Sequence, residues 1–226
     1  MKYIILLFLI LCRFSLAETK LKVMVIDTGV DGSNLSLVKH IPKQYQTSFD
    51  MNDTDGHGSH TFGIIAEDAC SQVELIPCKA FLKGIYTPRD RVFDCFQRAL
   101  DLNVDVINFS GGGYGYNPDE LDYLEKLNKK DIILVAALGN NKLDTTYNPY
   151  YPASYDLPNI VSVGALDPNK NAACFSNYND RSVWEPGVNI YSDYLDNTKK
   201  SLSGTSMATA KHTARLVKFF CKKINK

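Results

Sequence analysis

The chain has 226 residues, of which 45% are hydrophobic and 22% are charged. These fractions are close to globular averages, which excludes a wholly disordered chain, and the 14 glycines and 9 prolines exclude a collagen-like one. Lys and Arg together number 25, as do Asp and Glu, so no basic excess indicates a nucleic-acid partner and no acidic tail is expected.

The first 17 residues are predicted to be a secretory signal peptide. Lys2 precedes a nearly unbroken apolar run over residues 3–12, and residues 15–17 resemble a signal-peptidase site. About ten apolar residues are too few to span a bilayer, which takes roughly 20 helical residues. The flanking residues make a buried core helix the less favoured alternative. Cleavage after Ala17 predicts a secreted domain over residues 18–226 that does not interact with membranes.

The predicted mature chain contains five cysteines: Cys70, Cys78, Cys95, Cys174 and Cys221. In an oxidising compartment they predict disulfide bonds, and the odd number leaves at least one thiol unpaired within the chain. Their spacing does not determine the pairing, and burial as small apolar side chains is the alternative. The absence of a CxxC pair or a Cys/His cluster argues against a zinc finger.

Strand-like and helix-like segments alternate along the predicted mature chain. Apolar, β-branched runs predict strands at 21–26, 73–80, 104–109, 131–137 and 160–165. Apolar residues at helical spacing and a Pro-Asp-Glu start predict helices at 89–102, 118–128 and 206–222. This order predicts an α/β fold, a single domain with a parallel β-sheet covered by helices on both faces.

Polar residues gather where the predicted strands end. Asp27 ends the first strand, Ser110 follows the third and Asn140 follows the fourth. Open parallel sheets bind their ligands at the carboxyl ends of the strands. This edge of the sheet is therefore the predicted location of a functional site.

Three segments carry the residue types that nucleophilic catalysis by serine requires. A serine such as Ser206 needs a base with a pKa near 7, which His57 supplies, and that histidine needs a carboxylate such as Asp27. Backbone N–H groups at the helix start and the side chain of Asn140 are candidates for stabilising an oxyanion. Taken singly, Asp27 could be a turn residue, Ser206 a helix cap, and His57 with His60 half of a metal site that lacks a third ligand.

Six segments resemble the subtilisin-like (subtilase) family of serine peptidases. They are VIDTGVD at 25–31, DGHGSHTFGIIA at 55–66, INFSGGG at 107–113, AALGN at 136–140, YPASYDLPNIVSVGA at 151–165 and GTSMAT at 204–209. They follow the family order over nearly the whole predicted mature chain, and GTSMAT alone is highly specific.

The resemblance implies a subtilisin-like fold and a secreted serine endopeptidase that hydrolyses peptide bonds through an acyl-enzyme. It implies that Asp27 orients His57, that His57 acts as general base and then as general acid, and that Ser206 is the nucleophile. Asn140 would donate to the oxyanion. The implied partners are protein or peptide substrates.

The resemblance also implies two substrate-binding segments. Ser110, Gly111 and Gly112 resemble an edge strand that pairs with extended substrate backbone. Leu138 and Gly139 belong to the opposite wall of the primary pocket, and Leu138, where the family usually has glycine, is expected to narrow it. Several tyrosines lie in loops near this region and would either line an apolar pocket or simply pack: Tyr114, Tyr116, Tyr147, Tyr150 and Tyr151.

Two departures from the family leave alternatives to an active peptidase open. Ala210 replaces a proline, which is expected to straighten the last helix and shift Ser206 slightly. Only residues 18–20 precede the first strand in the predicted mature chain, so a folding helper or inhibitor acting in trans is a possible partner. The alternatives are an inactive, peptide-binding relative and an acyl-enzyme peptide ligase. Residues 204–208 lack the second glycine of GxSxG, which argues against a lipase.

No cofactor or metal ion is predicted. The loop at 67–72 is shorter than the subtilisin loop that helps to bind calcium, so that site is expected to be missing. Asp50, Asp53 and Asp55 could hold a structural calcium ion, but a solvated acidic loop is the favoured interpretation of these carboxylates.

Overall fold

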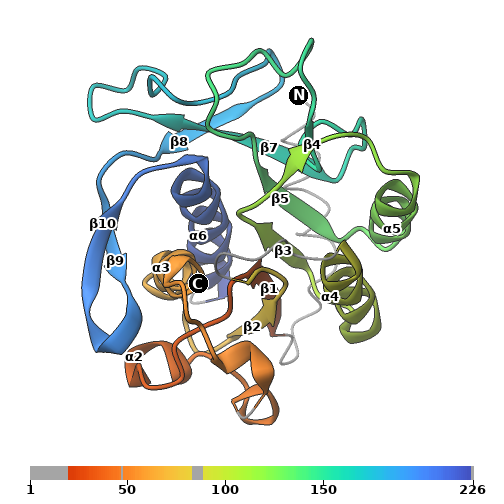
Figure 1. Ribbon diagram of the computed structural model, residues 1–226. Helices are drawn as coiled ribbons and strands as arrows, with labels where there is room; N and C mark the ends of the chain where they lie inside the picture. Colours follow the sequence, from red (N-terminus) through yellow and green to blue (C-terminus); the bar gives the residue numbers. More distant parts are fainter. Residues whose placement is uncertain (1–19, 47, 83–88, 225–226) are drawn as a thin grey trace.

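The computed structural model describes residues 20–46, 48–82 and 89–224 (Figure 1). The predicted signal peptide over residues 1–17 lies outside the described residues and stays a prediction. No helix in the described ranges has both the length and the apolar character needed to cross a bilayer.

A parallel sheet of six strands forms the centre of the molecule, in the order β2-β1-β3-β5-β7-β8. Its strands are β1 (Leu21–Asp27), β2 (Val73–Lys79), β3 (Val106–Phe109), β5 (Ile133–Ala137), β7 (Ile160–Leu166) and β8 (Val183–Pro186). The first five match the predicted strands with small differences at their ends. The edge strand β8 was not predicted, because its four residues include a proline and form no apolar run.

Helices cover both faces of this sheet, as the sequence predicts (Figure 1). They are α2 (Leu35–Val38), α3 (His57–Ala66), α4 (Arg89–Leu102), α5 (Pro118–Lys129) and α6 (Thr205–Ile224). Successive side chains of β1 alternate between the two cores. Val23 and Val25 pack on the side of α3 and α6, and Met24 and Ile26 pack on the side of α4 and α5.

The predicted helix at 89–102 has the observed bounds of α4, and α5 is one residue longer than predicted. Asn117 caps α5 by accepting a hydrogen bond from the Glu120 N–H at 3.0 Å. The helix α6 runs without interruption through Ala210, the residue that replaces the proline of the family.

Two antiparallel pairs of strands lie outside the main sheet. The hairpin of β9 (Ile190–Asp193) and β10 (Lys199–Leu202) runs beside α3, and β4 (Gly113–Tyr114) pairs with β6 (Tyr150–Tyr151). The hairpin was not predicted because most of its side chains are at least partly exposed and carry no clear apolar alternation.

Two disulfide bonds confirm the prediction that cysteines of this chain pair and that at least one stays unpaired. Cys70–Cys221 joins the end of α6 to the loop after α3, and Cys78–Cys95 joins β2 to α4. Cys174 is a free and exposed thiol.

Candidate active site

Asp27 and His57 form the first corner of the candidate site. Asp27, the last residue of β1, is only 1% exposed, and its Oδ1 lies 2.7 Å from His57 Nδ1. The same carboxylate accepts hydrogen bonds from the Thr28 N–H at 2.8 Å and the Thr61 hydroxyl at 3.0 Å. The carboxylate is held in place and fixes the proton of His57 on Nδ1, which leaves Nε2 as the free base.

The charges around His57 favour its protonated form. Burial lowers the pKa of His57, but the adjacent Asp27 charge and hydrogen bond, aided by Asp55 and Asp53, outweigh burial and raise the pKa above its ordinary value of 6.5. An imidazole in this setting can take up a proton readily, because the resulting positive charge is compensated by Asp27.

Asp53 organises the loop that presents His57. Its Oδ1 accepts hydrogen bonds from the Thr28 hydroxyl and from the N–H groups of Asp55 and Gly56, and its Oδ2 accepts two from Ser59. One buried carboxylate thus ties the end of β1 to the first turn of α3.

Gly58, the residue after His57, has no room for a side chain. A Cβ at Gly58 would collide with the carbonyl oxygen of Gly29, which follows β1. Glycine is therefore required where the start of α3 meets the end of β1.

Ser206 forms the second corner, in the first turn of α6. It is 9% exposed, and its hydroxyl donates to the carbonyl oxygen of Ser110 at 2.9 Å, while the Ser110 hydroxyl donates to the Ser206 carbonyl oxygen at 3.0 Å. Asn108 in turn donates to the Ser110 hydroxyl at 2.9 Å. These bonds attach the start of α6 to the carboxyl end of β3.

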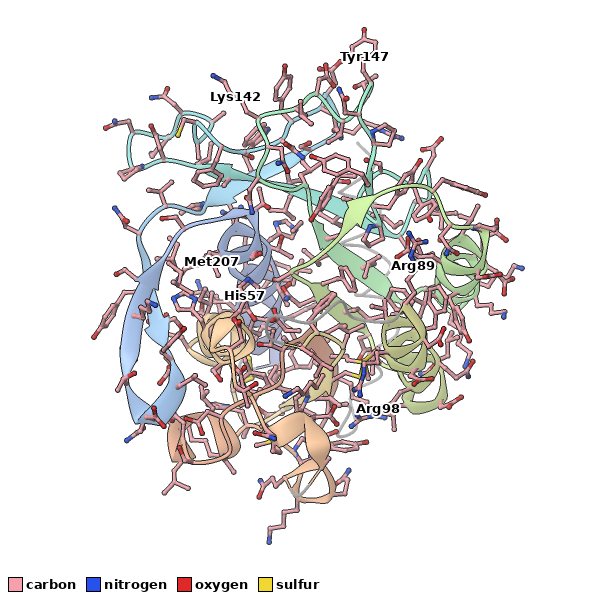
Figure 2. All side chains as sticks on the ribbon, in the orientation of Figure 1. His57, Arg89, Arg98, Lys142, Tyr147 and Met207 are labelled. Atoms are coloured by element: carbon pink, nitrogen blue, oxygen red, sulfur yellow. A yellow bond between two sulfur atoms is a disulfide. The ribbon has the colours of Figure 1, made fainter. Side chains whose placement is uncertain are left out.

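The helices that carry the two corners, α3 and α6, pack against each other. In the projection of Figure 2, His57, the first residue of α3, and Met207, which follows Ser206 in α6, are both seen near the middle of the molecule. In the described residues the hydrogen bond of the Ser206 hydroxyl goes to Ser110 rather than to His57. Catalytic hydrogen bonds often form fully only when substrate is present.

Asn140 lies beyond β5, next to the start of α6. Its Oδ1 accepts from the Thr205 N–H at 2.9 Å and from the Thr205 hydroxyl at 3.0 Å. A backbone N–H can only donate, so these contacts identify the Asn140 oxygen and leave its Nδ2 group as the available donor. The Ser206 N–H lies in the first helical turn, where no intrahelical carbonyl is available. Both groups can donate to a developing negative charge.

The Subtilase family model matches residues 18–219, nearly all of the chain after the predicted signal peptide. The chain belongs to the subtilase family. It is 33% identical to subtilisin DY of Bacillus licheniformis over 199 residues, which cover 83% of this chain and 72% of that protein.

Two further relatives are considerably longer than this chain. It is 32% identical to the thermophilic serine proteinase of Bacillus sp. (strain AK1), with 86% of this chain and 50% of that protein covered. It is 31% identical to subtilisin-like protease 2 of Plasmodium falciparum (isolate 3D7), with 83% and 16% covered. These matches place this subtilase among the serine-type endopeptidases.

The predicted substrate-binding residues lie at the ends of two neighbouring strands of this subtilase. Ser110, Gly111 and Gly112 follow β3, and Leu138 and Gly139 follow β5. Leu138 differs from the expectation: its side chain is fully buried in the core beside α4 and α5, so it does not itself form the exposed wall of a pocket.

A cavity of about 220 Å³ lies beside Gly112, on the side of α4 and α5. Its lining includes five aromatic side chains, those of Phe81, Phe93, Phe109, Tyr114 and Tyr151, together with Val92, Arg89, Glu120 and three glycines. Two of the predicted pocket tyrosines are thus found at a cavity. Tyr147 is 82% exposed and points away from the molecule (Figure 2).

A solvated acidic loop is the interpretation that the sequence favours for the carboxylates considered for calcium, and for two of the three it is wrong. Asp50 and Asp53 are each 8% exposed, and Asp50 accepts hydrogen bonds from the Lys79 N–H at 2.8 Å and from Arg98 at 2.6 Å. Their oxygens are occupied by donors of the protein itself. In the described ranges no group of three or more Asp, Glu, His or Cys side chains is placed to hold a metal ion.

His60 does not join His57 in a common site. Its side chain is fully buried, and Nε2 faces the carbonyl oxygens of Ile190 and Lys200 at 3.0 and 2.9 Å. His60 therefore attaches α3 to the β9–β10 hairpin, a structural role.

Sequence reasoning missed two residues that position the site. Thr205 holds the Asn140 side chain, and its hydroxyl also accepts from the Gly139 N–H at 3.2 Å. Asn177 is fully buried and binds the backbone of Leu138, Asn141 and Leu143. Thr205 lies inside the GTSMAT segment and could have been singled out there, whereas no local signal marks Asn177.

Proposed function

We propose that this chain is a secreted serine endopeptidase that cleaves protein or peptide substrates through an acyl-enzyme on Ser206. The observation that carries the proposal is the 2.7 Å contact between Asp27 and His57 Nδ1, at the start of a helix that packs against α6, which has Ser206 in its first turn. Family membership supports peptidase activity, and the geometry supports the assignment of these three residues. Two disulfide bonds support export.

In the proposed reaction, substrate binding redirects the Ser206 hydroxyl from the Ser110 carbonyl to His57 Nε2. His57 takes the hydroxyl proton as Oγ attacks the scissile carbonyl carbon. The Ser206 N–H and Asn140 Nδ2 stabilise the oxyanion, and removal of one such donor typically costs about 2.7–4 kcal/mol of transition-state stabilisation.

The imidazolium then protonates the leaving amine, the C–N bond breaks and the acyl-enzyme remains. Water enters, His57 takes one of its protons, and the hydroxide attacks the ester carbonyl. Collapse of this second intermediate releases the carboxylic acid and returns the proton to Ser206. Asp27 stays ionised throughout and stabilises the imidazolium.

The test is labelling by a fluorophosphonate that reacts with activated serines. The full chain is expressed with its own leader in a secreting host, and protein from the medium is labelled and weighed by intact-mass spectrometry. We expect one label per chain, and a labelled species that begins at Glu18. Labelling should disappear in Ser206→Ala and in His57→Ala.

Ser203→Ala is the matched control. Ser203 is an exposed serine three residues before Ser206, and its hydroxyl accepts from the Asn189 N–H at 2.9 Å. It should label like the unmodified chain. A secreted chain that shows a cooperative thermal transition but takes up no label would overturn the proposal and favour a peptide-binding role.

A further inference from the structure

Two glycines at neighbouring strand ends lie close in the chain to residues of the proposed site. Gly112 lies two residues after Ser110, whose carbonyl oxygen binds the Ser206 hydroxyl, and Gly139 directly precedes Asn140. A scissile carbonyl must lie within reach of Ser206 and Asn140 together. The side chain of the residue that carries this carbonyl would then enter the gap between Gly112 and Gly139.

The ring of Tyr150 occupies this gap. A Cβ added at Gly112 would lie 2.5 Å from Cε1 and 3.1 Å from Cζ of Tyr150. A Cβ added at Gly139 would lie 3.1 Å from Cδ2 and from Cε2 of the same ring. Cε1 belongs to one edge of the ring, and Cδ2 and Cε2 belong to the other. The ring therefore spans the gap from one glycine to the other.

The backbone of Tyr150 is held firmly in this position. Its N–H donates to the Ser154 hydroxyl at 2.9 Å, and its carbonyl oxygen accepts from the Ser154 N–H at 2.9 Å. Strand β6, which begins at Tyr150, pairs with β4 so that Tyr150 lies opposite Tyr114. The side chain thus projects from a fixed strand rather than from a loose loop.

A second aromatic ring supports the first. The Tyr114 and Tyr150 rings meet edge to face with centroids 5.2 Å apart. The Tyr114 hydroxyl donates to Asn141 Oδ1 at 2.9 Å, so this side chain reaches from one wall of the gap to the residue after Asn140 on the other. Burial, followed by the charge interaction with Tyr114, raises the pKa of Tyr150, which keeps its hydroxyl neutral in the gap.

We infer that Tyr150 is a specificity-determining residue that fills the primary side-chain pocket, so that the enzyme cleaves after residues with small side chains such as glycine, alanine or serine. The inference rests on the proposed peptidase function. A large residue before the scissile bond would have to displace a packed ring and break its contacts with both walls and with Tyr114. An alanine methyl group requires no such movement.

The experiment uses two tripeptidyl diphenyl phosphonates that differ only in their last residue, an alanine or a phenylalanine analogue. The serine hydroxyl attacks phosphorus and expels phenol, so the second-order rate of inactivation reports fit to the pocket without a known substrate. The unmodified chain should react at least about tenfold faster with the alanine probe. Tyr150→Gly should change the ratio of the two rates by at least about tenfold in favour of the phenylalanine probe.

Two variants keep the interpretation specific. Tyr150→Phe retains the ring and should retain the preference for alanine. Tyr147→Ala, which removes a tyrosine ring that is 82% exposed, should leave both rates unchanged. The fluorophosphonate, which carries no amino-acid side chain, is run beside every variant as a measure of the activated serine and of folding.

The outcomes separate the two claims. If fluorophosphonate labels Ser206 but the unmodified chain reacts equally well with both peptide probes, the pocket inference is wrong and the peptidase proposal stands. The same conclusion follows if Tyr150→Gly labels normally and keeps the original ratio. If fluorophosphonate does not label the folded chain, the peptidase proposal fails, and the inference fails with it.

Discussion

The two corners of the candidate site are held by different kinds of interaction. Around His57, the buried carboxylates of Asp27 and Asp53 accept hydrogen bonds from backbone and hydroxyl groups. Around Ser206, the bonds join neutral partners, namely hydroxyls, amides and carbonyl oxygens of Ser110, Thr205 and Asn140. In the proposed mechanism, the first corner sets the proton affinity of the base, while the second sets the position of the nucleophile and of the oxyanion donors.

This difference predicts that removing charge from the first corner has the largest effect. In Asp27→Asn the shape of the side chain is kept, but the amide can present its N–H₂ group to His57 and favour the wrong tautomer, and it does not stabilise the imidazolium. We expect kcat to fall by about 10⁴-fold. The measurement is steady-state hydrolysis of a fluorogenic peptide, with thermal unfolding followed in parallel.

Asp68→Asn is the matched control for that change. Asp68 pairs with Lys218 at 2.7 Å on the surface, far from the reaction in the proposed mechanism, and such pairs contribute little to stability. Its kcat should equal that of the unmodified chain. A fall of less than about tenfold in Asp27→Asn would contradict the orienting role assigned to the carboxylate.

The second corner is tested by Asn140→Ala, which removes one of the two proposed oxyanion donors and adds no charge. The predicted fall in kcat is about 10²–10³-fold, with little change in KM, because the bond forms mainly in the transition state. Asn148→Ala alters an exposed asparagine in the same long loop and should have no effect. A rise in KM with unchanged kcat would instead indicate a contact made equally in the ground state.

Thr205 sharpens this test, because it acts on Asn140 from inside α6. Thr205→Val removes the hydroxyl bond to Asn140 Oδ1 but leaves the backbone N–H bond in place. We expect a kcat between those of Asn140→Ala and the unmodified chain, and Thr205→Ser should restore it. A kcat that stays low in Thr205→Ser would mean that packing of the methyl group, not the hydrogen bond, matters.

The elements predicted correctly are those whose buried side chains recur at a regular spacing along a short stretch of the sequence. The side chains of Val92, Phe96, Ala99 and Leu100 recur at helical spacing and are all buried in α4. The hairpin of β9 and β10 carries no such pattern, because it is stabilised by contacts with distant residues. One of these is the Ser192 hydroxyl, which donates to the His60 carbonyl oxygen at 2.9 Å.

The same distinction applies to the site. Asp27, His57 and Ser206 are recognisable because their residue types and glycine-rich surroundings are required by the chemistry. The positions of Asp53 and Tyr150 depend on segments far away in the chain. The acidic neighbours of Asp53 predict a solvated side chain, yet Asp53 is buried. The sequence leaves open whether Tyr150 lines a pocket or packs, and the structure places its ring between two glycines. Such roles depend on the assembled structure.

The smallest predicted effect concerns the pH dependence of the first corner. His57 must be neutral to act as a base, and its pKa is raised above 6.5. The acid limb of kcat/KM should therefore have an apparent pKa above 6.5, with activity lost as the pH falls through it. Stability should change in the opposite sense. The contribution of protonated His57 is fully present below its unfolded pKa and is lost as the pH rises through the folded value.

Asp55→Asn isolates the weaker part of this effect. Asp55 Oδ1 accepts a hydrogen bond from the backbone N–H of His57 at 3.3 Å, and an asparagine oxygen can accept the same bond. The substitution removes the negative charge of Asp55, which raises the pKa of His57. The acid limb should move to lower pH, while kcat at its high-pH plateau stays unchanged. Asp68→Asn, which is remote from His57, should leave the limb in place. An unchanged limb in Asp55→Asn would mean that solvent screens this charge and that Asp27 dominates the proton affinity of the base.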